Sequence, residues 1–453
     1  MRHFGGFNQA IGSFARDRKG NFAVVFGVAA SVLALAVGFA VDTAQLMNAK
    51  SALREAVDSA VTSTARSITL GDITEDDAPK MVKAFLTANS TGGILTYDQI
   101  VLDKLTVDHA AKTVEVVAYV DVPLYFPLFG MEKTKRISNA GAALYSDKQI
   151  EVAMMLDLTG SMKGQKIEDL ITAAKNAVDT FLGSQDPAKP RVRVSIVPYA
   201  NSVNVGSLAA SSVFVETRTS QRKQAPGNND PQMASASPNP GNCATERKGD
   251  YQYRDDGPQV SMVNRDFLLS TFASQTDTRA CPAVAMMPLT ADADALKTAI
   301  GHFVADGGTA GHIGVQWTWY MLSESWGSVL KASQRPAAVN PKKVAKYAIL
   351  MTDGEFNLSY FDAQSVGQVY NSKGKEPTRT SAKTLCEAMK AKGIEIFTVG
   401  FDLNEENARE TLGACASPGT DKVRYYYEAA DGAELDSAFQ AIARNIENLT
   451  LTK

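Results

Sequence analysis

A run of 20 residues without a charged side chain, Phe22 to Val41, is the strongest constraint that this sequence places on its fold. At 1.5 Å per residue, a helix of this length spans about 30 Å, the thickness of the hydrocarbon core of a bilayer. Because lipid cannot hydrogen-bond to a peptide backbone, a segment in that core has to be helical. The sequence therefore predicts a transmembrane helix over residues 21–41.

The charges beside this run predict its orientation. Arg16, Arg18 and Lys19 precede it, whereas Asp42 follows it. The positive-inside rule places the basic flank in the cytoplasm. We therefore expect residues 1–20 to form a cytoplasmic basic tail, and everything after Asp42 to lie on the other side. A cleaved signal peptide is the alternative, since residues 38–40 have the small-x-small pattern of a cleavage site.

A helical pattern continues beyond the apolar run, which favours a permanent anchor. No glycine or proline interrupts residues 39–66, and apolar residues recur every three or four positions. The sequence therefore predicts an extended amphipathic helix over residues 42–67. Its apolar face consists of Leu46, Ala49, Leu53, Ala56 and Ala60.

Residues 68–148 predict a small α+β module. We expect a helix at 78–88 and strands at 99–107, 113–122 and 133–145. The middle strand becomes continuously apolar after its first residues, so we expect both of its faces to be covered. The aromatic loop at 125–129 (Tyr-Phe-Pro-Leu-Phe) could contact the membrane or a partner. Packing on its own sheet is the commoner role for such a loop, and we expect it here.

From residue 149 to residue 453, strands and helices alternate, which is typical of an α/β domain with a doubly wound, mostly parallel sheet. Ligands bind such sheets at the carboxyl ends of the strands, where the strand order reverses. An insertion at 202–290 interrupts the alternation, and its polar stretch 225–242 indicates a loop or disorder. It could cover the binding edge or be a surface addition. Strands are expected at 149–159, 191–200, 345–353, 394–402 and 423–430, and helices at 166–182, 293–306, 312–324, 381–393 and 433–449.

Two aspartates that follow apolar strands, Asp157 and Asp353, predict a metal site. Thr159 and Ser161 follow the first aspartate, and Thr309 lies in a glycine-rich loop between the two strands. Carboxylate and hydroxyl oxygens are ligands that Mg²⁺ prefers, and Mn²⁺ or Ca²⁺ would also accept them. Helix capping by Asp157 and Thr159 is the alternative, but it does not account for Thr309 or Asp353.

These five residues resemble the metal-ion-dependent adhesion site (MIDAS) of von Willebrand factor A domains. The pattern of that family is DxSxS, then a Thr, then an Asp followed by Gly, and Thr159 replaces the first Ser here. The resemblance implies that the hydroxyls contact the metal and that the aspartates often act through water. It also implies that the carboxylate of a partner protein fills an open coordination position.

The amino-terminal segment resembles that of the TadE/TadG-like proteins of tight-adherence (Flp-type) pilus systems. The matching parts are residues 16–21, the apolar run and residues 48–60. Lys19-Gly20 resembles a prepilin-peptidase site, but Val25 stands where such sites carry Glu, so we expect no processing. Together with the A-domain motifs, Cys281-Pro282 and the 438–443 tail, this layout resembles a TadG-like protein. That implies a periplasmic protein anchored in the bacterial inner membrane, with other pilus-assembly proteins as partners.

Four cysteines, all beyond the apolar run, would lie in a compartment that permits disulfides. Of the three pairings that four cysteines allow, we expect Cys243–Cys281 and Cys386–Cys415.

The remaining motifs and the charge narrow the function. The chain has no CxxC, HExxH, GxSxG or Walker lysine motif, and its net charge of −3 gives no case for nucleic acid. We therefore expect a binding protein and not an enzyme. A cell-surface adhesin that uses the same metal site is the first alternative, and a metal-dependent hydrolase that uses the same carboxylates is the second.

Overall fold

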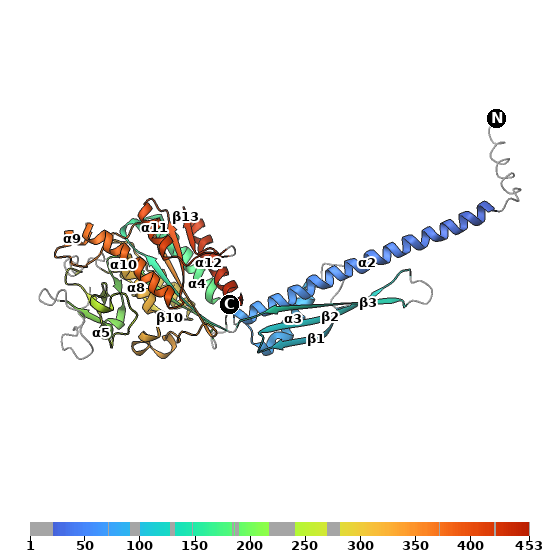
Figure 1. Cartoon of the computed structure of the whole chain (residues 1–453), viewed down its shortest axis with the longest axis horizontal. Helices are drawn as coiled ribbons and strands as arrows, with labels where there is room; N and C mark the ends of the chain where they lie inside the picture. Colours follow the sequence, from blue (N-terminus) through green and yellow to red (C-terminus); the bar gives the residue numbers. More distant parts are fainter. Residues whose placement is uncertain are drawn as a thin grey trace, which may run out of the picture. The chain divides into compact units, whose positions relative to one another are not determined.

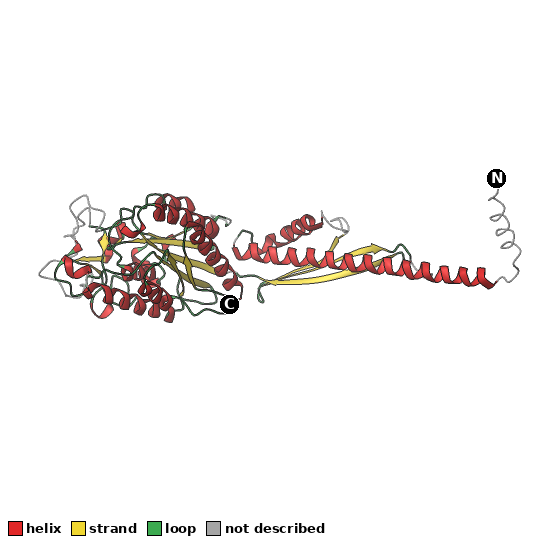
Figure 2. Ribbon diagram, turned by 90° about the horizontal axis from the view of Figure 1, so that it is seen from above, coloured by secondary structure: helices red, strands yellow, loops and turns green. Residues whose placement is uncertain are grey.

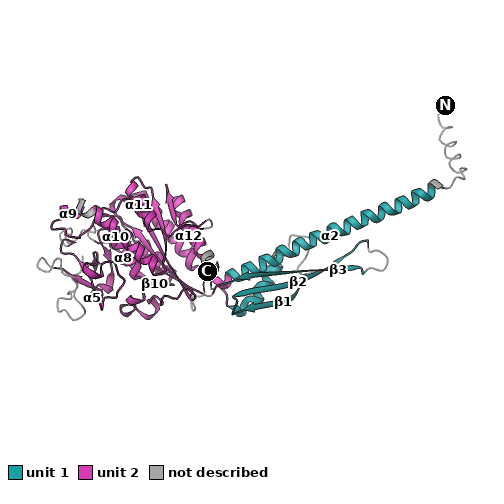
Figure 3. Ribbon diagram, viewed as in Figure 1, with its two compact units in different colours: residues 1–66, 75–145 teal, residues 67–74, 146–453 magenta. Residues whose placement is uncertain are grey.

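The chain divides into two compact units, residues 1–66 with 75–145 and residues 67–74 with 146–453 (Figure 3). The structure is a computed structural model. It describes residues 21–70, 72–90, 100–126, 132–146, 148–183, 185, 190–216, 241–269, 281–370, 372–420 and 423–452.

The first unit is built on one long helix, α2 (Asn21–Leu70) (Figure 1). Among the described residues it is the one helix with the length and composition to cross a membrane. Its large apolar side chains from Val24 to Phe39 are exposed, whereas the face predicted from the sequence is buried from Ala49 onward. The half of the helix predicted to be amphipathic thus buries one face. Its fully buried apolar residues include Ala49, Leu53, Ala56, Val57 and Ala60.

An antiparallel sheet in the order β1-β2-β3 and the helix α3 (Ala78–Ser90) complete this unit. In β2 the residues with even numbers are buried, while Glu115 and Asp121 on the other face are exposed. The expectation that both faces are covered is therefore wrong, because the odd-numbered residues are exposed or half-exposed in the described part of the chain. Gly141 of β3 allows close packing on α2, since a Cβ there would lie 2.8 Å from Val57 Cγ1. The strands are β1 (Ile100–Asp108), β2 (Thr113–Pro123) and β3 (Thr134–Leu144).

The first two residues of the aromatic loop, Tyr125 and Phe126, are more exposed than expected. The side chains of Tyr125 and Phe126 are 66% and 53% exposed, so packing on the sheet is the wrong prediction for these two residues. Residues 127–129 lie outside the described part of the chain.

The second unit contains an eight-stranded sheet in the order β13-β12-β11-β4-β5-β6-β8, with β10 paired to β5. The five strands from β13 to β5 are parallel. The chain runs from β4 to β5 on one side and from β11 to β13 on the other, so the order reverses between β4 and β11. The doubly wound α/β class is confirmed. The strands are β4 (Gln149–Asp157), β5 (Val192–Tyr199), β6 (Val203–Asn204), β8 (Cys243–Ala244), β10 (Met287–Thr290), β11 (Val344–Thr352), β12 (Glu395–Phe401) and β13 (Tyr426–Ala429).

Helices cover both faces of this sheet (Figure 2). Met154 and Leu156 of β4 point into one apolar core, and Ala153 and Met155 point into the other. This two-sided burial explains why the strand reads as a continuous apolar run. One face carries α4 (Gln165–Leu182), α7 (Ala293–Ile300) and α12 (Gly432–Thr452), and the other carries α8 (Gly311–Tyr320) and α10 (Ser372–Ala391). Shorter elements are α5 (Ala209–Ser212), α9 (Val366–Tyr370), α11 (Glu406–Cys415), β7 (Val213–Val215) and β9 (Val263–Arg265).

One helix boundary differs from the prediction in a way that matters for the site. The helix expected at 293–306 ends at Ile300, and Gly301 follows it. The chain then turns, and the backbone N–H of Asp306 donates to the carbonyl oxygen of Leu158 at 2.8 Å. The loop that contains Thr309 is thereby brought to the end of β4.

The insertion is part of the core and of the sheet. Its strands β6 and β8 extend the sheet beyond β5, and Val203 and Leu289 are buried in the core beneath α8. Most of its polar stretch, residues 225–240, lies outside the described part of the chain. The structure contains the disulfides Cys243–Cys281 and Cys386–Cys415, the pairing expected from the sequence.

The double variant Cys386→Ser/Cys415→Ser should melt several degrees below the native protein. The bond closes a loop with a sequence separation of 29 residues, and constraining a loop of that size stabilises by about 2–4 kcal/mol. Differential scanning calorimetry of both proteins measures the shift. The gap should close under strong reductant; a gap of equal size there would show that the buried serines, and not the lost bond, cause it.

Candidate metal centre

The two candidate aspartates lie at the same edge of the sheet. Strands β4 and β11 are parallel, and Met155 is the partner of Leu350 in their register. Asp157 comes two residues after Met155, and Asp353 comes three residues after Leu350. Both carboxylates therefore emerge at the carboxyl ends of adjacent strands, at the point where the strand order reverses.

The carboxylate of Asp157 is fully buried and held by three donors. Oδ1 accepts a hydrogen bond from the backbone N–H of Thr159 at 2.8 Å. Oδ2 accepts from the hydroxyls of Tyr199 and Thr352, both at 2.7 Å. Burial and the neighbouring charge of Asp157 raise the pKa of Tyr199 well above its usual value, so that hydroxyl stays a donor. Asp157 is thus a fixed, oriented negative charge.

Two hydroxyls connect this aspartate loop to Asp353. Thr159 Oγ1 lies 3.0 Å from Ser161 Oγ, and Ser161 Oγ donates to Asp353 Oδ1 at 2.6 Å. In an octahedral Mg²⁺ site with bonds of about 2.0–2.1 Å, adjacent ligand oxygens lie about 2.9 Å apart. The three oxygens therefore have the chemistry of such ligands, and their two separations are close to that of neighbouring ligands in such a site. Ser161 is exposed, so the group opens to solvent.

The loop of Thr309 is attached to the same place. The N–H of Gly160 donates to the carbonyl oxygen of Gly307 at 2.8 Å, and the N–H of Gly308 donates to Asn201 Oδ1. Thr309 is buried, and its N–H donates to Asn357 Oδ1 at 2.9 Å. The segments that carry the five predicted residues therefore converge at one edge of the sheet.

A lysine that the sequence pattern did not indicate offsets part of the negative charge at this edge. Lys166 Nζ, in the first turn of α4, lies 3.2 Å from Asp353 Oδ2 and 2.9 Å from Asp402 Oδ2. Burial lowers the pKa of Lys166, but the carboxylates of Asp402 and Asp353 outweigh that effect and raise it above its usual value. The ammonium group therefore stays charged and occupies one side of the Asp353 carboxylate.

The electrostatics of Asp353 show how crowded with negative charge the edge is. Burial and, after it, the charge of Asp157 raise the pKa of Asp353 to about 6, although Ser161 and Lys166 act in the opposite direction. A cation between the two carboxylates would remove this penalty, because it favours the ionised form of both.

Asp402 carried a signal in the sequence, whereas Lys166 did not. Asp402 follows the apolar strand β12 directly, as Asp157 ends β4, so the strand-end argument would have found it. The contact between Lys166 and Asp353 joins residues 187 positions apart, and no local pattern indicates it.

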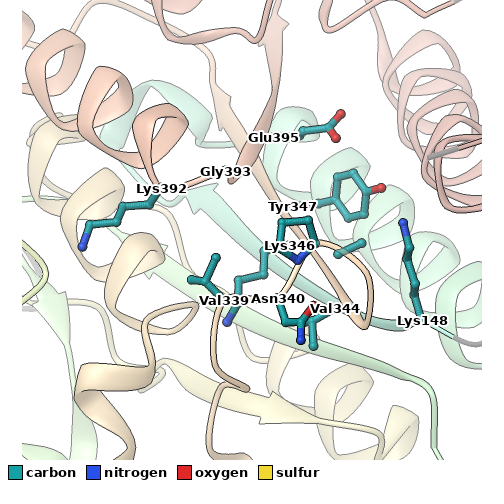
Figure 4. Close-up of a pocket in the computed structure, with 11 residues that line it drawn as sticks. Lys148, Val339, Asn340, Val344, Lys346, Tyr347, Lys392, Gly393 and Glu395 are labelled. Carbon is teal, nitrogen blue, oxygen red and sulfur yellow. The ribbon is translucent and has the colours of Figure 1, made fainter.

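The donor set consists of few carboxylates. Within the described ranges, no group of three or more His, Cys, Asp or Glu side chains is placed to hold a metal ion. The candidate centre therefore depends on its hydroxyl oxygens. A cavity lined by residues such as Lys148, Asn340 and Glu395 lies elsewhere, at the amino-terminal ends of β4, β11 and β12 (Figure 4). It is at the opposite edge of the sheet from Asp157.

Comparisons with solved structures find pilus proteins at low identity. The von Willebrand factor domain of the type V pili tip protein Mfa5 from Porphyromonas gingivalis is 14% identical, with a TM-score of 0.37, covering 68% of this chain and 97% of that chain. The pilus adhesin SpaC from Lactobacillus rhamnosus GG is 12% identical, with a TM-score of 0.36, covering 77% of this chain. The match spans about a third of that adhesin, 34% of its length.

A third similar structure is the manganese-loaded TRAP protein of Plasmodium vivax, 11% identical, with a TM-score of 0.30, covering 65% of this chain and 72% of that chain. No curated protein sequence matches the chain. A family model described as putative Flp pilus-assembly TadE/G-like matches residues 20–67. The resemblance seen in the amino-terminal sequence is therefore confirmed, and this segment of the chain is similar to the putative TadE/G-like Flp pilus-assembly family.

Proposed function

We propose that this chain is a membrane-anchored protein that assembles or anchors a tight-adherence (Flp-type) pilus, and that it captures a partner protein through a divalent metal ion. The metal would be held by Asp157, Thr159, Ser161, Thr309 and Asp353. The amino-terminal family match supports the pilus association. The convergence of three distant loops at the β4/β11 edge is the observation that carries the metal-dependent part.

The geometry suits binding better than catalysis. The hydroxyls of Thr159 and Ser161 and one oxygen of Asp353 are close enough to be neighbouring ligands, and Ser161 faces solvent. Asp157 already accepts three hydrogen bonds, so it would act through water. A protein donor set of this size leaves a coordination position for the carboxylate of a partner. Mg²⁺ fits oxygen donors of this kind and keeps part of its water shell, and Mn²⁺ or Ca²⁺ accept the same donors.

The anchoring part of the proposal uses α2. Its apolar residues are exposed over a length that spans a hydrocarbon core, and the helix continues without a break into the buried face of the first unit. This continuity supports a permanent anchor over a cleaved signal peptide. With the basic flank in the cytoplasm, both units would lie in the periplasm, where the two disulfides are stable.

The full chain in detergent should bind Mg²⁺, and Ser161→Ala should lose most of that affinity at an unchanged melting temperature, because Ser161 is exposed. Isothermal titration calorimetry measures the affinity. Pull-downs from cell envelopes should recover pilus-assembly proteins with Mg²⁺ and lose them with chelator. Ser333→Ala is the matched control, since Arg193 contacts only its backbone oxygen. Equal Mg²⁺ affinity in both variants would refute the site. Asp157→Ala is a poorer test, because it leaves the buried hydroxyl of Tyr199 without its acceptor, at about 1–3 kcal/mol, and leaves the hydroxyl of Thr352 with only the carbonyl oxygen of Gly354.

Lys166→Met should bind Mg²⁺ more tightly, by roughly tenfold or more, because the native ammonium repels a cation at the site, and at 4 Å such a repulsion amounts to ~4 kcal/mol for an effective dielectric of 20. Lys163→Met is the control, since Lys163 pairs with Asp306 and not with Asp353. Calorimetry of the two variants decides the point. Weaker binding in Lys166→Met would mean that the lysine supports the site.

A reporter fused after Lys453 should be active in the periplasm and inactive in the cytoplasm, because the basic flank lies before the span. Mass spectrometry of the purified protein should find residues 1–20 still attached. A new amino terminus at Asn21 or Val41, or cytoplasmic reporter activity, would contradict the proposed anchor.

A further inference from the structure

The connection that follows β2 lies against the membrane-spanning part of α2. Gly38 belongs to the uncharged run, and a Cβ there would come within 2.6 Å of Phe126 Cγ. The ring of Phe126 therefore packs on the backbone of the span itself. Because Gly38 lies three residues, or about 4.5 Å, before the end of that run, this ring reaches the depth at which lipid begins.

A buried carboxylate fixes the connection in this position. Asp42, the first charged residue after the span, is only 7% exposed. Its Oδ1 accepts a hydrogen bond from the N–H of Tyr125 at 2.8 Å, and its Oδ2 accepts one from the N–H of Phe126 at 3.0 Å. Hydrogen bonds to a charged acceptor are stronger than neutral ones. The two amides are thus tied to the helix, while both aromatic side chains remain exposed.

A pocket with basic side chains lies one step further from the span, between α2 and β3. Arg136 there is bound by Asp121 at 2.9 Å, whereas Lys50 and Lys135 form no ion pair within the described residues. Side chains of a helix tilt toward its amino terminus, which on α2 is the membrane end. Lys50 therefore extends back toward the membrane surface. The pocket is lined by Thr43, Leu46, Met47, Lys50, Lys135, Arg136, Ile137 and Ser138.

A lipid bilayer is a suitable partner for both the exposed aromatic pair and the basic pocket. Exposed aromatic residues concentrate at membrane–water interfaces, and basic residues close to a span contact lipid phosphates. Tyr125 and Phe126 continue the exposed apolar surface that runs from Val24 to Phe39. Lipid already surrounds that surface if the helix spans the membrane, so the same bilayer would cover the aromatic pair.

We propose that the membrane end of the first unit is a lipid-binding surface. Tyr125 and Phe126 insert into the interface of the leaflet on the side of Asp42, and Lys50 and Lys135 bind the phosphate of an anionic phospholipid. The surface holds the three-stranded sheet at a fixed height above the bilayer. The inference rests on the span crossing the membrane and does not depend on the metal centre.

The insertion can be measured on the full chain with its native disulfides. The variant Phe126→Cys is labelled with a nitroxide and placed in vesicles of phosphatidylethanolamine and phosphatidylglycerol. Electron paramagnetic resonance then compares how often the nitroxide collides with oxygen, which concentrates in lipid, and with a water-soluble nickel chelate. Collisions with oxygen should be the more frequent at this position. Leu144→Cys is the control, because Leu144 is exposed at the opposite end of β3, and nickel should dominate there. Tyr125→Cys repeats the test with Phe126 still packed on Gly38. Nickel access at 125 and 126 equal to that at 144 would overturn the insertion.

The lipid pocket needs a second measurement. Native mass spectrometry of the detergent-solubilised chain compares the retention of phosphatidylglycerol and phosphatidylcholine. Lys50→Gln/Lys135→Gln should bind phosphatidylglycerol about thirtyfold more weakly, from the usual contribution of a lysine near an anionic surface. Lys80→Gln/Lys83→Gln removes two exposed lysines from α3 and should change little. The same loss in both double variants, or none in either, would overturn the pocket assignment.

Discussion

The parallel pairing of β4 with β11 is the constraint on which the second unit depends. These strands are adjacent in the sheet although 186 residues separate the end of one from the start of the other. Their pairing places Asp157 and Asp353 side by side, and the turn after α7 adds the loop of Thr309 through the contact between Gly160 and Gly307. Strand order alone thus converts three unrelated loops into one polar edge. Burial of each strand on both faces makes the arrangement rigid, because neither core can yield without loss of packing.

The polar edge combines strong order with unfavourable electrostatics. Donors from Tyr199 and Thr352 fix Asp157, yet the pKa of Asp353 is raised to about 6 by burial and by its neighbour. The protein offsets part of this cost with its own cation, since Lys166 contacts Asp353 and Asp402. The carboxylates of such a site attract a cation, but the ammonium group of Lys166 already compensates part of their charge. A metal ion would therefore compete with Lys166 for Asp353. In the proposed metal site, that competition would let the chain tune metal affinity without changing the ligand residues.

In the first unit, a small sheet packs along part of a long helix. Small residues allow the close approach, at Gly141 against Val57 and at Gly38 against Phe126. Polar contacts then fix the register, with Asp42 bound to two backbone amides. The helix thereby has an exposed apolar surface over one half and is a packed element over the other. Among the described residues, the sheet has one face that is not fully buried, as the exposed and half-exposed residues of β2 show.

The sequence determined the features that depend on local pattern. The uncharged run, the amphipathic face from Ala49 to Ala60, the alternating strands and helices and the DxTxS loop were all visible, because hydrophobic periodicity and capping chemistry act within a few residues. Tertiary structure decided what depends on distant contacts. Examples are the contribution of the insertion to the sheet, the partly exposed face of β2, the exposure of Tyr125 and the contact of Lys166 with Asp353. These follow from which surfaces meet after folding, and a side chain that pairs with a residue 187 positions away leaves no trace in its local sequence.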